Sequence, residues 1–289
     1  MDADLVLDVR AQVGEGPIWD PDRNLLVWVD VTGSAVHQYS PGSGHDHEIA
    51  VGQYVGAAAS RTRGGLVLAL QHGFGLLDTD TGRVDMIADT EADRPGNRMN
   101  DGKCDSAGRF WAGTMSFSLD KGAGSLYRLD PEYQVSTVLN NLTLSNGLGW
   151  SPDDRTMYFI DSVTQGIDAF AYDAITGAIT NRRRLVDIAP ELGMPDGMTV
   201  DADGAIWVGL WRGWAIHRYT PDGHLDRVVR LPVGYVTSCA FGGSDLGDLY
   251  ITTAAYQLDA DALAGQPHAG GLFRCRPGPV GLRANAFRG

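Results

Sequence analysis

The chain has 289 residues, 43% of them hydrophobic, which is enough to bury a large core. Its 36 acidic and 23 basic residues give a formal net charge of −13, which argues against a nucleic-acid partner and against docking on an anionic membrane surface. No run of about 18 apolar residues occurs, so no membrane-spanning helix is expected.

Cysteine usage and the N-terminal residues bear on the compartment. The three cysteines, Cys104, Cys239 and Cys275, are odd in number and show no CxxC spacing, so neither a disulfide framework nor a zinc cluster is indicated. The first residues lack the basic start and apolar stretch of a signal peptide. We therefore expect a cytoplasmic protein, and the sequence leaves open whether it is a monomer or a homodimer.

A repeated unit runs through the chain: a short apolar strand, a polar turn and an aromatic-rich strand. Glycine is abundant, at 38 of 289 residues, about twice its usual share of about 7%. The clear copies pair residues 14–19 with 25–30, 100–104 with 109–113, 146–150 with 156–161, and 195–200 with 205–209. Weaker copies begin near Val55 and Thr237. Internal repetition of this kind indicates a repeat architecture.

Turns and a third strand complete each unit. The turns at 20–23, 106–108, 151–154 and 201–204 are made of Asp, Pro, Gly, Ser and similar residues, which supply the fixed or positive φ angles that hairpins need. The third strands, at 35–39, 125–129, 167–172 and 215–219, alternate apolar and polar residues as half-buried strands do. No stretch has sustained helical periodicity.

Six copies at a spacing of roughly 40–50 residues predict an all-β fold, a six-bladed β-propeller, with residues 1–289 as a single domain. A pair of β-sandwiches is the alternative, but it gives no reason for a regular period. We also expect the strand at residues 5–9 to pair with the late strand at 271–275, because this pairing would close the ring and remove an exposed edge.

Polar residues stand where the innermost strands begin, in four of the six copies. They are Glu15, the pair Asn100 and Asp101, Asn146, and Asp196. In a propeller these positions converge on one axis, and buried carboxylates are costly unless they are paired or bind a metal. Such an all-oxygen cluster suits Ca²⁺, Mg²⁺ or Mn²⁺ and tolerates Zn²⁺ or Fe²⁺. The alternative is that these residues cap turns; each, however, has a glycine nearby that would let the backbone approach a ligand closely.

Several other kinds of site are absent from the sequence. No GxSxG, HExxH or GxGxxG pattern occurs, so the sequence contains no serine-hydrolase elbow, zincin helix or dinucleotide-binding turn. The candidate oxygen cluster is therefore the candidate functional site that remains after these motifs are excluded.

The motifs around these residues resemble the senescence-marker-protein/gluconolactonase family, which includes regucalcin and bacterial sugar lactonases. The motifs lie at 14–17, 97–103, 109–115, 145–147, 195–198, 237–243 and 269–273, in order along nearly the whole chain. The resemblance implies a six-bladed propeller that uses one divalent metal cation to hydrolyse aldonolactones such as gluconolactone, xylonolactone or arabinonolactone. It therefore implies a carboxylic ester hydrolase acting on a small-molecule sugar lactone.

The resemblance also assigns roles to individual residues. Glu15, Asn146 and Asp196 fall where the family has its metal ligands, and Asp196 also falls at the family's proposed proton acceptor and donor. Arg98 and Asn100 match positions that contact substrate. These are roles that the likeness implies for the matching residues of this chain.

The chain departs from the family pattern at Ser118, where regucalcin-like members carry a glutamate that contacts substrate. This departure puts the sugar preference in doubt, although Ser118 is still expected to orient sugar hydroxyls. Asp101 is a further substrate-side residue, and either Asp196 or Asp101 could be the general base. Two alternative functions stay open: a calcium-dependent arylesterase or organophosphatase, and a calcium-binding propeller with no enzymatic activity.

Overall fold

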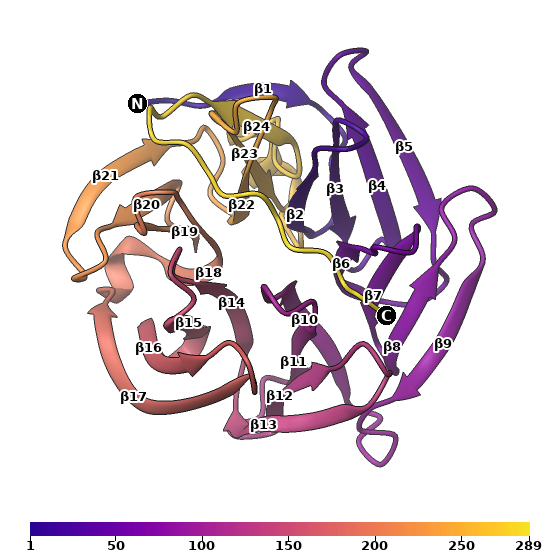
Figure 1. Cartoon of the computed structure of the whole chain (residues 1–289). Coiled ribbons are helices and arrows are strands. Elements are labelled where there is room, and N and C mark those ends of the chain that lie inside the picture. The colour runs from indigo at the N-terminus through magenta and orange to yellow at the C-terminus, as the bar shows by residue number, and fades with distance from the viewer.

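The computed structural model describes residues 1–289 and forms a ring of six four-stranded antiparallel sheets (Figure 1). The first strand of each sheet contacts the first strands of the two neighbouring sheets, so these six strands form the inner wall of the ring. The predicted all-β fold, a six-bladed propeller, is confirmed. No helix is long and apolar enough to cross a membrane.

Five blades use four consecutive strands each, from the inner strand outward. Blade 1 holds β2 (Gly14–Asp20), β3 (Leu25–Asp30), β4 (Ala35–Ser40) and β5 (His45–Ala50), and blade 2 holds β6 (Val55–Ser60), β7 (Leu66–Leu70), β8 (Gly73–Leu77) and β9 (Val84–Asp89). Blade 3 holds β10 (Asn97–Cys104), β11 (Phe110–Ser116), β12 (Gly124–Leu129) and β13 (Val135–Leu142), and blade 4 holds β14 (Ser145–Trp150), β15 (Thr156–Asp161), β16 (Gly166–Asp173) and β17 (Ala178–Asp187). Blade 5 holds β18 (Met194–Val200), β19 (Ile206–Trp211), β20 (Ala215–Tyr219) and β21 (Leu225–Arg230).

Blade 6 joins the two ends of the chain. It consists of β22 (Val236–Gly242), β23 (Asp248–Thr253), β24 (Leu272–Cys275) and, as its outer strand, β1 (Asp4–Leu7). Leu5 pairs with Phe273 in antiparallel register. The predicted closure is therefore confirmed, and it ties the N-terminal strand into the last sheet.

The outer strands are the part of each blade that the repeat pattern did not reveal. The outer strand of blade 4, β17, has nine of its ten residues partly or fully exposed, among them the run Arg182 to Arg184. A strand whose side chains are mostly solvated carries little apolar alternation, and this is why the repeat seemed to contain three strands instead of four.

The turns between the inner and second strands behave as predicted. Asn24 and Asp154 adopt left-handed backbone angles, with φ of 53° and 55°. Gly108 and Gly204 occupy the corresponding turns of blades 3 and 5 with φ of 80° and 82°. These angles favour Asn, Asp and Gly, which explains the turn composition.

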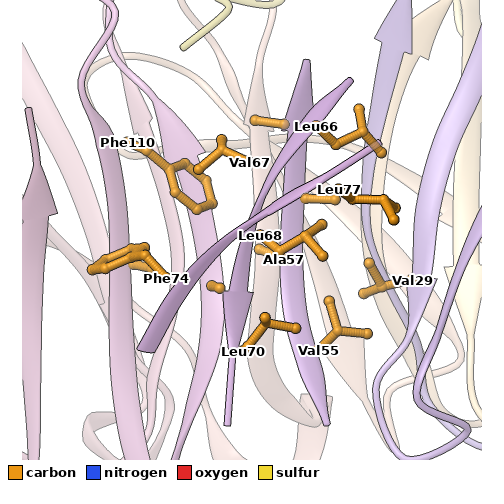
Figure 2. Packing of buried hydrophobic residues seen from close by; sticks show 14 of the residues in the cluster. Val29, Val55, Ala57, Leu66, Val67, Leu68, Leu70, Phe74, Leu77 and Phe110 are labelled. Carbon is orange, nitrogen blue, oxygen red and sulfur yellow. The ribbon is translucent and has the colours of Figure 1, made fainter. Parts of the chain in front are cut away.

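The core lies between the faces of adjacent blades. Its largest cluster has 25 buried hydrophobic residues from blades 1 to 3 and the C-terminal segment. Figure 2 shows part of this cluster, in which Val55 and Leu68 of blade 2 lie between Val29 of blade 1 and Phe110 of blade 3, and Phe74 of blade 2 lies beside Phe110. These side chains are fully buried, so neighbouring blades are held together by continuous apolar packing.

A buried aspartate at the end of the inner strand braces two of the blades. In blade 3, Asp105 accepts hydrogen bonds from Trp111 Nε1 (2.8 Å) and from Arg109 Nε (2.6 Å). In blade 5, Asp201 accepts the equivalent bonds from Trp207 Nε1 (2.8 Å) and Arg218 Nε (2.8 Å). Both aspartates are completely buried, and their charge is compensated by the arginine.

The last residues form a strap, here defined as residues 276–289, across one face of the ring (Figure 1). The strap contacts the residues at or beyond the ends of several inner strands: Phe287 N donates to Ser60 O (2.8 Å), and Asn285 Nδ2 donates to Cys104 O (3.4 Å). Phe287 is completely buried. The opposite face, where the inner strands begin, carries the candidate site.

Short helical segments lie in the connections on that opposite face. They are η1 (Ser162–Thr164), η2 (Pro190–Leu192) and α1 (Ala260–Gly265). The α1 segment is capped by Asp259, whose side chain accepts from Ala262 N (2.8 Å). The helical segments of the chain thus all lie on this side of the ring.

Candidate metal centre

A β-bulge in each inner strand places the candidate residues. In β2, β10, β14 and β18 one extra residue is inserted relative to the second strand of the blade, between Glu15 and Ile18, Met99 and Gly102, Ser145 and Leu148, and Pro195 and Met198. A bulge interrupts the alternation of a strand and redirects its side chains. The four predicted positions therefore stand at equivalent irregularities around one axis.

Asn146 and Asp196 are in direct contact. The amide nitrogen of Asn146 donates to Asp196 Oδ1 and to Ser162 Oγ (3.0 Å). Its amide oxygen, Oδ1, is buried and has no hydrogen-bond partner. A buried acceptor without a donor costs free energy, and a cation is a natural partner for it.

Glu15 completes a group of three oxygen-bearing side chains with Asn146 and Asp196. All three are buried. Burial raises the pKa of the Glu15 carboxyl well above its ordinary value, and the nearby carboxylates of Asp196 and Asp101 raise it further. Burial also raises the pKa of Asp196 to about 8, although the hydrogen bond from Asn146 lowers it. Two adjacent carboxyl groups in a buried site resist ionisation unless a positive charge compensates them.

The residues present fit a divalent metal. Two carboxylates and one unpartnered amide oxygen form a hard oxygen set of the kind that Ca²⁺, Mg²⁺ and Mn²⁺ prefer. No group of three or more His, Cys, Asp and Glu side chains is placed to hold a metal, so the third oxygen has to come from Asn146. Asp101 therefore stands near the two carboxylates without joining them in one ligand cluster.

The raised pKa values predict that metal binding releases protons. Below pH 8 the metal-free site retains protons on its carboxyl groups, and a divalent cation displaces them. The apparent affinity is expected to rise about tenfold per pH unit for each displaced proton between pH 6 and 7.5. Calorimetric titration of Mn²⁺ at pH 6.5, in two buffers of different ionisation enthalpy, measures the number of protons released.

Thermal unfolding supplies a second readout of the same groups. Because the folded-state pKa values lie above the unfolded ones, the metal-free chain is expected to lose stability as the pH rises from about 4 towards 8.

A Mn²⁺ titration at pH 6.5 that released no proton would contradict the prediction that metal binding displaces protons. An Asp196→Asn variant, which lacks one of the titrating groups, serves as the control.

Arg98 and Asn100 lie together beside the metal set on β10. Arg98 Nη1 donates to Asn100 Oδ1 (2.8 Å) and to Met99 O (2.9 Å), and Asn100 Nδ2 donates to Ser145 O (2.9 Å). Burial lowers the pKa of Arg98 to about 10, against the opposing effect of Glu15 and other nearby groups, so the guanidinium stays charged at neutral pH. Asn100 thus orients Arg98, whose Nε and Nη2 have no protein partner.

Ser118 lies farther from this group. It belongs to the exposed loop between β11 and β12, and its hydroxyl donates to Asp120 Oδ2 (2.7 Å). No contact joins it to the metal set. The structure therefore brings Glu15, Asn146 and Asp196 together, places Arg98, Asn100 and Asp101 beside them, and leaves Ser118 at the rim.

Two glycines near the candidate residues allow adjacent blades to pack closely. A Cβ on Gly147 would lie 2.6 Å from Asp196 O, and a Cβ on Gly56 would lie 2.2 Å from Asn100 O. These glycines thus allow the inner strands of adjacent blades to approach one another. Close backbone approach to a ligand at these glycines stays a prediction.

Two neighbours of the site did not emerge from the sequence. Ser162, at the start of η1, is buried and bonds to Asn146, but no local motif marks it. Lys103 follows Asp101 by two residues, and its ammonium donates to Met198 O (2.6 Å). Its position in the motif at 97–103 was visible, yet nothing in the sequence showed that it crosses between blades.

Fold and site together define a six-bladed propeller with an oxygen-lined candidate metal centre where its inner strands begin. Residues 13–255 match the family model for the SMP-30/gluconolactonase/LRE-like region. The chain belongs to this family. The predicted resemblance is confirmed, and membership supports a sugar lactonase function in general terms.

Individual relatives match nearly end to end. Regucalcin from Xenopus laevis is 37% identical over 98% of this chain and 97% of its own length. A Bacillus subtilis protein, YvrE, provisionally named a sugar lactone lactonase, is 37% identical over 100% of this chain and 99% of its own. The crystal structure of regucalcin from Agrobacterium tumefaciens, described as a calcium-binding protein, superposes with a TM-score of 0.95 at 30% identity, covering 99% and 97% of the two chains.

Proposed function

We propose that this chain hydrolyses sugar lactones to aldonic acids with one divalent cation held by Glu15, Asn146 and Asp196. The observation that carries the proposal is the meeting of two buried carboxyl groups with the unpartnered Asn146 Oδ1. The Bacillus subtilis relative, whose name refers to sugar lactones, supports this substrate class. Ca²⁺, Zn²⁺, Mn²⁺, Mg²⁺ and Fe²⁺ are the candidate cations.

Lactone opening needs a polarised carbonyl, a positioned water and a proton path. A bound divalent cation supplies Lewis-acid polarisation of the carbonyl and stabilises the negative charge that develops on its oxygen. The protein's own part is to hold the lactone ring in the site and to move one proton. In the reaction a bond forms between the water oxygen and the carbonyl carbon, and the bond from that carbon to the ring oxygen breaks.

Asp196 is proposed to take the proton from water and return it to the leaving ring oxygen, which becomes a hydroxyl group. Asp101 is the alternative base. It is buried, accepts from Gly102 N (2.7 Å), and lies close enough to raise the pKa of both Glu15 and Asp196. An Asp101→Asn variant separates the two roles, because a base outside the ligand set can be removed with metal binding retained.

Arg98 is proposed to bind sugar hydroxyls or the nascent carboxylate. Its Nη1 is occupied by Asn100 and Met99, which fixes the guanidinium plane. The remaining donors, on Nε and Nη2, are free to bind substrate oxygens. Asn100 uses both ends of its amide within the protein, so it acts mainly by holding Arg98 in place.

Acid release from lactones tests the proposal. Metal-depleted protein is mixed with gluconolactone, xylonolactone, arabinonolactone and galactonolactone, before and after addition of each candidate cation, and proton release is followed in weak buffer. Turnover that requires a cation supports a lactonase. Preferential turnover of apolar aryl esters or phosphotriesters would point to an arylesterase or organophosphatase, and cation binding without any turnover would point to a calcium-binding propeller.

Replacing Ser118 with glutamate is expected to change the sugar preference. The substitution adds a carboxylate at the rim of the site that can accept hydrogen bonds from sugar hydroxyls, at a position where the hydroxyl now bonds to Asp120. Relative kcat/KM values for the four aldonolactones are expected to shift by about 10-fold, since one well-placed hydrogen bond contributes about 1–2 kcal/mol.

The control for this variant is cation affinity, which should stay within twofold because Ser118 does not contact the metal set. A specificity profile identical to that of the parent chain would show that position 118 does not select substrates.

We also propose a cytoplasmic location, supported by three buried cysteines that are all free.

A further inference from the structure

Lys103 is a buried cation that the proposed reaction does not use. It lies on β10, two residues after Asp101 and beyond the bulge between Met99 and Gly102. Burial lowers the pKa of the Lys103 ammonium, and the negative charges of Asp101 and Glu15 raise it. Lys103 therefore sits deeper along the axis than the candidate metal set, towards the strap.

The ammonium group of Lys103 crosses from one blade to another. Lys103 Nζ donates to the carbonyl of Met198 at 2.6 Å. Met198 belongs to β18 and follows Asp196 by two residues, and blade 4 lies between the two strands in the ring. Lys103 also lines a cavity of about 270 Å³ on the strap side, together with Thr199 and Asn285. Lys103 thus lies between the candidate site and the strap.

The charges around the axis nearly balance. Glu15, Asp101 and Asp196 contribute three negative charges when ionised, and Arg98 and Lys103 contribute two positive ones. With all three carboxyl groups ionised, a bound divalent cation would change this net charge from −1 to +1. A site of net positive charge favours an anionic transition state and an aldonate product over the neutral lactone.

We propose that Lys103 is a positioning residue that fixes a positive charge beneath the metal site, weakening cation binding in exchange for stronger stabilisation of the developing anion. The inference rests on the proposed function: its first half on the proposed cation site alone, and its second half on the lactonase activity as well. The first half concerns the cation and the protein only, because like charges repel wherever the cation is held by Glu15, Asn146 and Asp196.

Replacing Lys103 with methionine removes the charge and retains most of the side-chain volume. The K103M protein is expected to bind Mn²⁺ about 3- to 10-fold more tightly than the parent at pH 8.5, because a repulsive charge has gone. With Mn²⁺ present, its kcat for gluconolactone is expected to fall about 10- to 100-fold, and its affinity for gluconate is expected to fall as well.

The opposite signs of these effects separate an electrostatic role from a purely structural one. If Lys103 merely ties β10 to β18, its loss should weaken Mn²⁺ binding and activity together. K103R keeps the charge and is expected to restore parental Mn²⁺ and gluconate affinities. Lys121→Met, in the exposed loop between β11 and β12, removes the same charge elsewhere and should change neither.

Calorimetric titration of Mn²⁺, followed by gluconate, on folded K103M, K103R and Lys121→Met proteins is the experiment. Tighter Mn²⁺ and weaker gluconate binding in K103M, with both restored in K103R, supports the inference. Mn²⁺ binding that is weaker or unchanged in K103M overturns it. The Mn²⁺ titration needs no turnover, so a chain that proved inactive on every lactone would refute the proposed function and still leave the charge effect measurable. Should K103M fail to fold by circular dichroism, K103Q provides the same comparison.

Discussion

Asp196→Ala protein is expected to lose lactone hydrolysis by at least about 1,000-fold and to lose measurable Mn²⁺ binding. Asp196 is proposed both to hold the cation and to carry the proton, so its loss removes a metal ligand whether Asp196 or Asp101 is the base. Its contact with Asn146 and its proximity to Glu15 place it at the centre of the buried oxygen set. The measurements are proton release from gluconolactone and calorimetric Mn²⁺ titration at pH 8.

The fold should survive this substitution. Burial raises the pKa of Asp196 to about 8, which means that the folded chain resists its ionisation. At alkaline pH the metal-free alanine variant is therefore expected to unfold at the same temperature as the parent or a higher one. Glu15→Ala should likewise abolish activity, whereas Asp222→Ala, in an exposed turn of the same blade as Asp196, should leave it intact. Full activity in either Asp196→Ala or Glu15→Ala would refute the assignment of the site.

Asp105→Ala is expected to destabilise the protein by about 3–5 kcal/mol, the range observed when one partner of a buried ion pair is removed. Asp105 is completely buried and accepts hydrogen bonds from Arg109, Trp111 and Tyr172. Its removal leaves the Arg109 charge without its carboxylate and takes the acceptor from two aromatic side chains of blades 3 and 4. Urea unfolding followed by tryptophan fluorescence measures the change.

Asp201→Ala should behave similarly, because Asp201 holds Trp207 and Arg218 in blade 5 in the same way. Asp222→Ala is again the control, since the Asp222 side chain is 73% exposed. A loss of less than about 1 kcal/mol in Asp105→Ala would show that these buried aspartates do not brace the blades.

The ring of blades could be predicted from the sequence because its first three strands carry strong patterns. Inner strands are apolar, second strands are aromatic-rich, and third strands alternate, with turn residues at regular intervals. The outer strands were not predicted, because residues such as Arg182 to Arg184 are exposed to solvent and show no apolar periodicity. The spacing of Asp105 from Trp111 recurs between Asp201 and Trp207, yet only the structure shows that each pair is hydrogen bonded.

The residues that form the candidate site could be predicted from the sequence, but their arrangement in space could not. The positions of Glu15, Asn146 and Asp196 at the starts of inner strands indicated that they converge. A one-residue bulge cannot be seen in a sequence, however, because it depends on how two strands pair. For the same reason two hydrogen bonds between residues on different strands or loops could not be foreseen: the one that Asn146 donates to Ser162 and the one that Lys103 donates to Met198.

The most direct test of the central claim is a crystal structure of the chain soaked in Mn²⁺, with anomalous scattering recorded near the manganese absorption edge. A single anomalous peak within about 2.0–2.4 Å of carboxylate oxygens of Glu15 and Asp196 and of Asn146 Oδ1 is the result that the proposed site predicts. A peak elsewhere in the ring, with these three side chains left as they are in the metal-free protein, would contradict it.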